Sequence, residues 1–145
     1  MLHDHRQLGV DLFNHTWTLL EQPERTSDEE DEMLGAAHAS RYHWSKASTE
    51  ARHQARGEWQ LARVYAVLGR GEPAVYHARR CLDWCGRGEV EDWDVAFAHE
   101  ALSRAFRAAG DETKAEEHRR RARELGDAIS DPEDREQFDK DWATL

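Results

Sequence analysis

"LARVYAVLGRGEPAVYHARRCL", residues 61–82, predicts two helices joined by a tight turn. Apolar and small residues recur every three or four positions on both sides of Gly69, which is the spacing of one buried helix face. Gly69 suits the end of a helix, and Pro73 suits the first turn of the next helix, where a missing N–H costs nothing. The stretch therefore predicts an antiparallel helical hairpin.

A second stretch, LSRAFRAAGDETKAEEHRRRA at residues 102–122, repeats this pattern. In both copies a leucine and an aromatic residue pack the first helix, a glycine turns the chain, and small residues let the second helix approach closely. Residues 8–47 fit as a third, degenerate copy, so an array of helical hairpins is expected. The residues that carry the pattern are Leu61, Ala62, Tyr65, Gly69, Ala74, Ala78 and Cys81 in one copy, and Leu102, Phe106, Gly110, Ala115 and Ala122 in the other.

These residues resemble the tetratricopeptide-repeat (TPR) family, which has a leucine, an aromatic residue, a turn glycine and small second-helix residues at these spacings. The two copies lie 41 residues apart, whereas the family repeats about every 34 residues. The extra length falls in residues 86–94, and Ser103 and Arg119 also depart from the family pattern. The resemblance implies a concave groove that holds a peptide or a partner protein.

The predicted fold is all-α: a TPR-like stack of about seven antiparallel helices. One domain is expected over residues 1–145, with hairpins at 3–47, 49–85 and 92–126 and a C-terminal capping helix at 131–143. Helix starts follow from capping residues, with either Thr26 or Ser27 before the second helix and Asp111 before the sixth. Ser27 followed by Glu30 fits a capping box, in which each side chain bonds to the other residue's backbone N–H.

The composition limits the class of partner. The chain has a net charge of −10 and a pI near 5.3, which argues against nucleic-acid binding because that affinity comes mainly from cationic contacts to phosphates. No stretch approaches the roughly 18 apolar residues of a membrane-spanning helix, and the N-terminal residues lack the pattern of a signal peptide. A cytoplasmic protein without a membrane partner is expected, and Cys81 and Cys85 should stay reduced there.

A candidate groove follows from the third predicted helix. Arg56, Trp59 and Arg63 lie on the side opposite its apolar face, at the positions that line the concave surface in the family pattern. The guanidinium groups of the two arginines could bind carboxylate or phosphate. An acidic peptide or a small anionic ligand is therefore the expected partner. The residues of the family's carboxylate-clamp subgroup are not reproduced. The predicted ligand-binding set is Arg41, Arg56, Trp59, Arg63, Glu100 and Arg104.

Two alternatives to this groove stay open. Glu58, Glu100 and neighbouring acids could instead neutralise the arginines in an internal ion-pair network. A small-molecule sensor or enzyme could use a polar pocket of His38, His43, Glu58 and His99, whose acid and base groups suit proton transfer. No nucleophile turn or phosphate loop accompanies them, so an enzyme is the less expected class and no catalytic residue is assigned. Self-association through the repeat faces is a further alternative.

No metal site or cofactor is predicted. In HASRYHW, residues 38–44, the two histidines are five positions apart and therefore about 140° apart around a helix, so they do not face one ion. His77, Cys81 and Cys85 share one helix stripe, but three ligands spread along a helix do not easily reach one metal. Cys81 also takes a small-residue packing position of the repeat, and free cysteines are commonly buried in this way.

Overall fold

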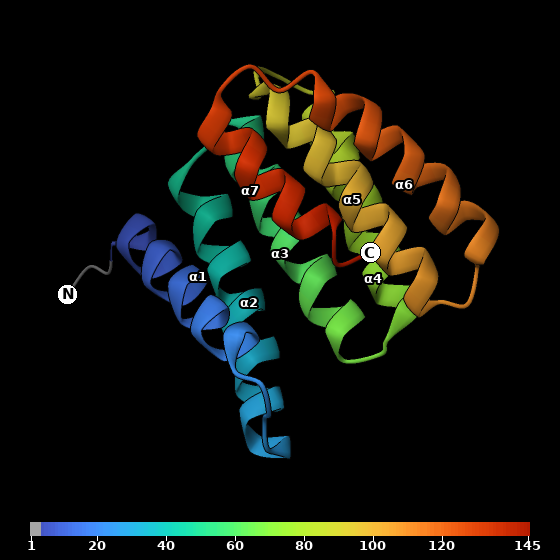
Figure 1. Ribbon diagram of the computed structural model, residues 1–145. Helices are drawn as coiled ribbons and strands as arrows, with labels where there is room; N and C mark the ends of the chain where they lie inside the picture. Colours follow the sequence, from blue (N-terminus) through green and yellow to red (C-terminus); the bar gives the residue numbers. More distant parts are fainter. Residues whose placement is uncertain (1–3) are drawn as a thin grey trace.

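The computed structural model describes residues 4–145, and in that part of the chain the regular elements are all α-helices (Figure 1). The all-α fold class is therefore confirmed. The predicted start of the first helix, at His3, lies outside the described residues. In chain order the helices are α1 (His5–Glu21), α2 (Ser27–Ala47), α3 (Ala51–Val67), α4 (Gly71–Cys85), α5 (Asp92–Ala108), α6 (Glu112–Asp127) and α7 (Pro132–Trp142).

Local capping explains where the helices begin. Thr26, rather than Ser27, is the N-cap of α2: its hydroxyl accepts from the Glu29 N–H at 3.2 Å, and the Glu29 carboxylate accepts from the Thr26 N–H at 2.9 Å. The predicted Ser27–Glu30 box is thus displaced by one residue, because Thr26 and Glu29 have the same spacing and type. Asp111 caps α6 as expected, accepting from the Lys114 N–H at 3.0 Å.

The two turn glycines end their helices in the same way. Gly69 and Gly110 have φ angles of 74° and 84°, a left-handed conformation that side chains other than glycine rarely adopt. The N–H that follows each glycine donates back to the aromatic residue of the helix: Arg70 to the Tyr65 carbonyl and Asp111 to the Phe106 carbonyl, both at 2.9 Å. Both helices therefore end in a Schellman motif, the equivalence that the sequence repeat predicts.

The helices pack as successive pairs, α1 with α2, α3 with α4 and α5 with α6, and each pair contacts the next. Small residues allow the close approach: Ala74 and Ala115, at the predicted second-helix positions, are completely buried. A Cβ on Gly71 would lie only 2.4 Å from the Ala109 backbone. The predicted TPR-like stack is compatible with this arrangement and stays a prediction.

The C-terminal helix α7 contacts α5 and α6 and lies in front of α3 and α5 (Figure 1). Its anchor is Phe138, which is completely buried among Ala96, Ala122 and Ile129. Gly126 on α6 makes room for the Phe138 ring. None of the helices in residues 4–145 combines the length and the hydropathy of a membrane-spanning segment.

Candidate functional site

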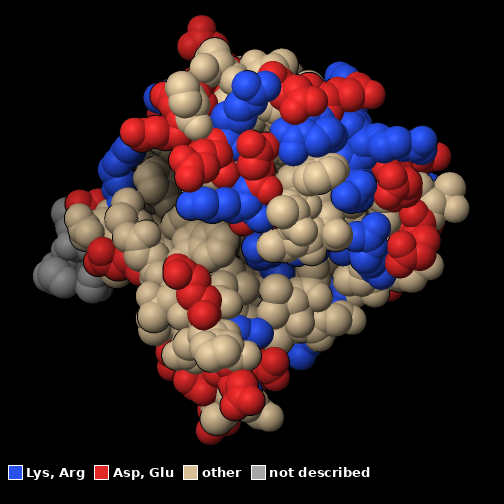
Figure 2. Space-filling view, in the orientation of Figure 1, with Lys and Arg blue, Asp and Glu red and all other residues tan. Residues whose placement is uncertain are grey.

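A cavity of about 410 Å³ opens between α7 and the helices α1, α3 and α5. Figure 2 shows this face, on which acidic and basic side chains are interspersed and the surface between α1 and α7 is hollowed, with charged side chains at its edge. Five helices contribute to the lining, which brings together residues far apart in the sequence. The lining residues are Phe13, Trp17, Ala55, Arg56, Trp59, Cys81, Trp93, Asp94, Phe97, Gln137 and Asp141.

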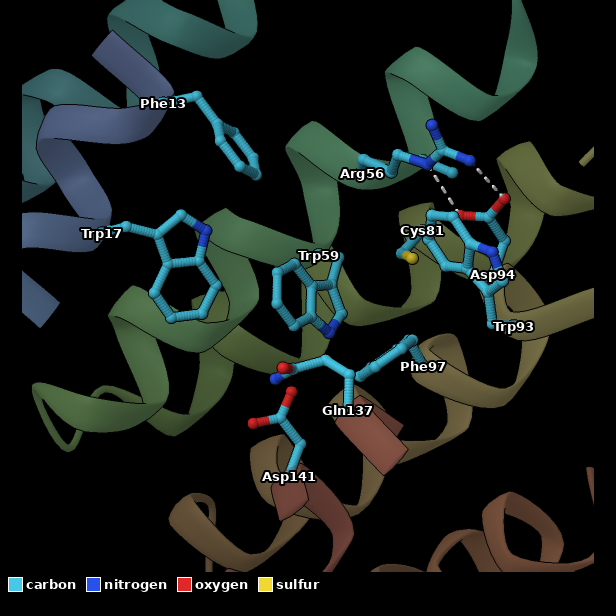
Figure 3. Close-up of a pocket in the computed structure, with 11 residues that line it drawn as sticks. Phe13, Trp17, Arg56, Trp59, Cys81, Trp93, Asp94, Phe97, Gln137 and Asp141 are labelled. Atoms are coloured by element: carbon cyan, nitrogen blue, oxygen red, sulfur yellow. Dashed lines mark hydrogen bonds and ion pairs between the residues drawn. The ribbon is translucent and has the colours of Figure 1, made fainter. Parts of the chain in front are cut away.

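Five aromatic side chains contribute to the cavity wall. Trp59 projects from α3 into the centre, with Trp17 of α1 on one side and Phe97 of α5 on the other (Figure 3). The Trp59 ring centroid lies 5.4 Å from that of Trp17 and 5.6 Å from that of Phe97. The indole N–H of Trp59 donates to Glu100 Oε1 at 3.2 Å, which fixes the orientation of the ring. Such a wall suits an apolar, aromatic group of a ligand.

The rim near α5 carries a paired charge. Arg56 donates from Nε and Nη2 to the two carboxylate oxygens of Asp94, both at 3.0 Å (Figure 3). Its guanidinium carbon also lies 4.2 Å from the Trp93 ring centroid, in a cation–π contact. The Asp94 side chain is almost completely buried. This bidentate ion pair therefore has a fixed geometry, and the Asp94 carboxylate balances the charge of Arg56.

A second charged cluster lies behind the cavity wall. The carboxylate of Glu100, on α5, is completely buried; its Oε2 accepts from Arg104 Nε at 3.0 Å and from Arg104 Nη2 at 2.6 Å. Arg63 of α3 lies between two carboxylates, with Nη1 3.6 Å from Glu100 Oε2 and Nη2 3.7 Å from Asp141 Oδ1. Asp141 belongs to α7 and lines the cavity, so this cluster connects α3, α5 and α7 at one end of it.

Burial changes the proton affinities in this cluster. It lowers the pKa of the Arg63 guanidinium, an effect that the Glu100 carboxylate partly offsets. It raises the pKa of the Asp141 carboxyl, and the Arg63 guanidinium partly offsets that increase. Desolvation disfavours the charged form of both groups. Both groups therefore depend on their charged neighbours to offset the cost of burial.

The predicted ligand-binding residues fall into three places. Arg56 and Trp59 line the cavity, and Arg63, Glu100 and Arg104 form the cluster behind it. Arg41 lies apart from them, where it donates to Glu58 Oε1 at 2.9 Å and to the Gln54 amide oxygen. Each of the four arginines has a carboxylate within 4 Å. Their role in ligand binding stays a prediction, and their charge is balanced inside the protein.

The four residues of the predicted polar pocket have different neighbours. Glu58 Oε2 is 2.6 Å from His77 Nδ1, and the His77 ring centroid is 5.7 Å from that of His38. In contrast, His43 Nδ1 is 2.8 Å from His5 Nδ1, and His99 Nδ1 is 3.0 Å from His118 Nδ1. Glu58 and His38 thus meet around His77 between α2, α3 and α4, whereas His43 lies against α1 and His99 against α6.

Burial is the first cause of the histidine pKa shifts. It lowers the pKa of His38, with the neighbouring His77 as the next cause, and it lowers the pKa of His99 to about 4, with His118 as the next cause. In contrast, the pKa of Glu58 is lowered, because its bonds to His77 and Arg41 together outweigh its burial. A neutral His38 and an ionised Glu58 are the favoured states near pH 7.

Within residues 4–145, no group of three or more histidine, cysteine or carboxylate side chains has the arrangement of a metal site. Cys81 is buried in the core and also reaches the cavity wall. Its pKa is raised by its hydrogen bond with Cys85 and by its burial. A thiol with a raised pKa is a poor nucleophile and a poor metal ligand at neutral pH, which agrees with a packing role.

Much of the cavity lining was missed by sequence reasoning. Trp17 and Trp93 are not among the predicted site residues, and neither is Phe97. A signal for Phe97 was available, because it lies 41 positions after Arg56, which is the spacing of the two repeat copies. Nothing in the sequence indicates that Gln137 and Asp141 of the capping helix reach the same place, because this depends on how α7 docks.

A smaller hollow of about 230 Å³ adjoins the aromatic cavity, and the two share Phe13 and Arg56. Trp44 of α2 and His53 of α3 form its far wall, with ring centroids 4.7 Å apart. The two hollows together extend along the same face from α2 to α7. This gives the face room for one large group and a smaller neighbouring one.

A comparison of the chain with protein-family models, with curated proteins and with solved structures finds no match in any of the three.

Proposed function

We propose that this chain is a binding module that holds an aromatic group in the cavity between α1, α3, α5 and α7. The cavity itself carries the proposal: about 410 Å³, walled by Trp17, Trp59, Phe97 and neighbouring rings. Buried aromatic pockets that accept an anchor side chain dominate the affinity of many protein interfaces. We place the module in a TPR-like stack in the cytoplasm, where its two free cysteines stay reduced.

The first form of this proposal is a peptide or partner protein that inserts an aromatic side chain. The adjoining smaller hollow supports it, because a peptide could place a second side chain there. We propose an aromatic anchor rather than an acidic one, since Arg56 and Arg104 already have carboxylates at hydrogen-bond distance. An acidic peptide would have to compete with those internal partners.

The second form is a free small molecule. The volume falls in the range of about 300–1,000 Å³ that small-molecule sites have, and the wall is mostly apolar with a few polar groups. Gln137 and Asp141 on α7 supply two of those polar groups and close one side of the cavity. A closed side favours a compact ligand over an extended chain.

Selection from a library of random peptides displayed on phage tests the first form. The expected result is enrichment of one aromatic position, whereas enrichment of acidic residues without an aromatic one would contradict the proposal. Calorimetric titration with indole and with N-acetyl-tryptophan amide tests the aromatic site itself. Saturable binding of either compound supports it, and no binding of either compound to the folded protein refutes it.

Two matched tryptophan variants locate the binding. Trp17→Ala removes part of the cavity wall and should weaken binding by roughly tenfold or more, since an aromatic contact and its buried area contribute at least about 1.4 kcal/mol. Trp84→Ala is the control for indirect effects, because Trp84 does not line the cavity itself but packs behind two lining residues, Ala55 and Cys81. Equal losses in the two variants would show that the effect is on stability rather than on the site.

A further inference from the structure

Behind the polar end of the cavity lies a cation whose hydrogen bonding is incomplete. Arg63 lies next to two lining residues: its guanidinium carbon is 5.9 Å from the Trp17 ring centroid, and its Nη2 is 3.7 Å from Asp141 Oδ1. Its Nη1 is buried and has no hydrogen-bond partner among residues 4–145. A buried donor without a partner is costly, so this guanidinium can gain from a further acceptor.

The nearest carboxylate is already engaged. Glu100 Oε1 accepts from the Trp59 indole, and Oε2 accepts twice from Arg104. Arg63 Nη1 stands 3.6 Å from Oε2, beyond ordinary hydrogen-bond distance. Glu100 therefore balances Arg104 first, and Asp141 is left as the principal partner of Arg63.

Asp141 is a weak partner for this arginine. Its oxygen is 3.7 Å from Nη2, and burial raises its pKa, so protonation is easier than for an exposed carboxyl. Without the Asp141 carboxylate beside it, the cluster consists of Arg63 and Arg104 against Glu100, which leaves one positive charge. A buried net charge favours an incoming group of the opposite sign.

We propose that the cavity binds a free planar aromatic carboxylate: the ring lies against Trp59 and Trp17, and the carboxylate takes the place of Asp141 beside Arg63. This rests on the proposed function of the cavity as an aromatic site. Two parallel N–H groups of a guanidinium match the two oxygens of a carboxylate. The incoming group would thus have the same chemistry as the side-chain carboxylate that now faces Arg63.

The charges at the cavity disfavour the other ligand classes. A cationic ligand would meet Arg56 over the Trp93 ring at 4.2 Å and Arg63 near the Trp17 ring at 5.9 Å, which already present like charge to those faces. A neutral aromatic ligand would fill the apolar wall but would leave Arg63 with only its two distant carboxylates, Glu100 at 3.6 Å and Asp141 at 3.7 Å. An aromatic carboxylate fits both ends of the site, because its ring contacts the aromatic wall and its carboxylate pairs with Arg63.

Calorimetric titration of the whole chain with three indoles tests this choice: indole-3-acetate, its neutral amide indole-3-acetamide, and cationic tryptamine. The acetate should bind roughly tenfold or more tightly than the amide, since a charge-assisted pair contributes more than a neutral hydrogen bond, and tryptamine should bind most weakly. Equal affinities of the acetate and the amide, or tightest binding of tryptamine, would overturn the carboxylate while leaving the aromatic site intact. No binding of any indole would overturn both.

Two variants should act in opposite directions. Asp141→Asn removes the competing carboxylate and should strengthen indole-3-acetate binding several-fold, with little change for the amide. Arg63→Gln should abolish the preference for the acetate over the amide. Asp139→Asn is the matched control on the same helix, because Asp139 pairs with Arg123 and is not part of the cavity lining.

Circular dichroism of each variant establishes that the helices persist. Should Arg63→Gln unfold, the Asp141→Asn arm still decides: weaker acetate binding in that variant refutes the proposal, and stronger binding supports it. A gain of the same size in Asp139→Asn would also refute it, since it would reflect only the loss of one negative charge from α7.

Discussion

Gly126→Ala should loosen the C-terminal helix from the rest of the protein. A Cβ built on Gly126 would lie 2.2 Å from Phe138 Cε2 and 2.6 Å from Phe138 Cδ2. Carbon atoms in contact lie about 3.5–4.0 Å apart, so the ring would have to move by more than about 1 Å. Phe138 is completely buried and has no free space to enter, which means that α7 itself has to shift.

Two opposing terms set the magnitude. Replacing glycine by alanine within a helix stabilises it by about 0.5–1 kcal/mol, whereas overpacking a core costs typically about 1–3 kcal/mol. The net expectation is a loss of about 1–2 kcal/mol in the free energy of unfolding, measured by urea denaturation. Gly35→Ala provides the control with the opposite sign, because Gly35 lies within α2 and a Cβ there would meet nothing within 4 Å.

A second substitution should relieve the clash. Phe138→Leu removes part of the ring that the new Cβ meets, so the double variant should be more stable than the sum of the two single changes predicts. Such non-additivity is typical of residues in contact. Stabilisation by Gly126→Ala, of the size seen for Gly35→Ala, would refute the close packing of α7 on α6 and with it the closed side of the cavity.

Three further outcomes are expected. Arg56→Met should lower the free energy of unfolding by about 3 kcal/mol in urea denaturation, because it leaves the buried Asp94 carboxylate without its two hydrogen bonds from Arg56; a loss below about 0.5 kcal/mol would show that the pair behaves like an exposed one. Burial, and then a neighbouring imidazole, lower the pKa of His99 to about 4 in the folded protein, so the neutral form is favoured by folding. The contribution of the neutral His99 imidazole to the free energy of unfolding is fully present above about pH 6.5 and is lost as the pH falls from there to about 4. After a discount for solvent screening this amounts to about 1–2 kcal/mol, and thermal melts across that range should show a smaller loss in His99→Gln. Cys81 should react with iodoacetamide much more slowly than Cys85 in the folded protein and at a similar rate in urea, since the pKa of Cys81 is raised and that of Cys85 is lowered; equal rates in the folded state would contradict the buried thiol.

Features that depend on neighbouring residues could be predicted from the sequence. The turns at Gly69 and Gly110 need a left-handed residue within a few positions of an apolar face, and Asp111 needs only the next three residues to act as a cap. These signals lie within one or two helical turns. The helix boundaries followed from them to within a few residues, and the choice of Thr26 over Ser27 was the main local difference.

Features that depend on how helices dock could not be predicted. Whether Arg56 is free or paired is decided by Asp94, which lies 38 positions further along the chain. The Asp141 carboxylate reaches Arg63 because Phe138 seats α7 against α5 and α6. A periodic pattern shows that a tryptophan such as Trp17 faces other helices, yet it does not distinguish a filled core from the wall of a cavity.

The position of α7 has a consequence for how the site forms as the chain is made. Synthesis proceeds from the N-terminus, so the rings of α1, α3 and α5 are available before Gln137 and Asp141, and the cavity is completed only when Phe138 has docked. A ligand that contacts both parts would bind chains with α7 in place and would hold that helix against the rest. Occupancy of the site would then report that the chain has folded as far as α7.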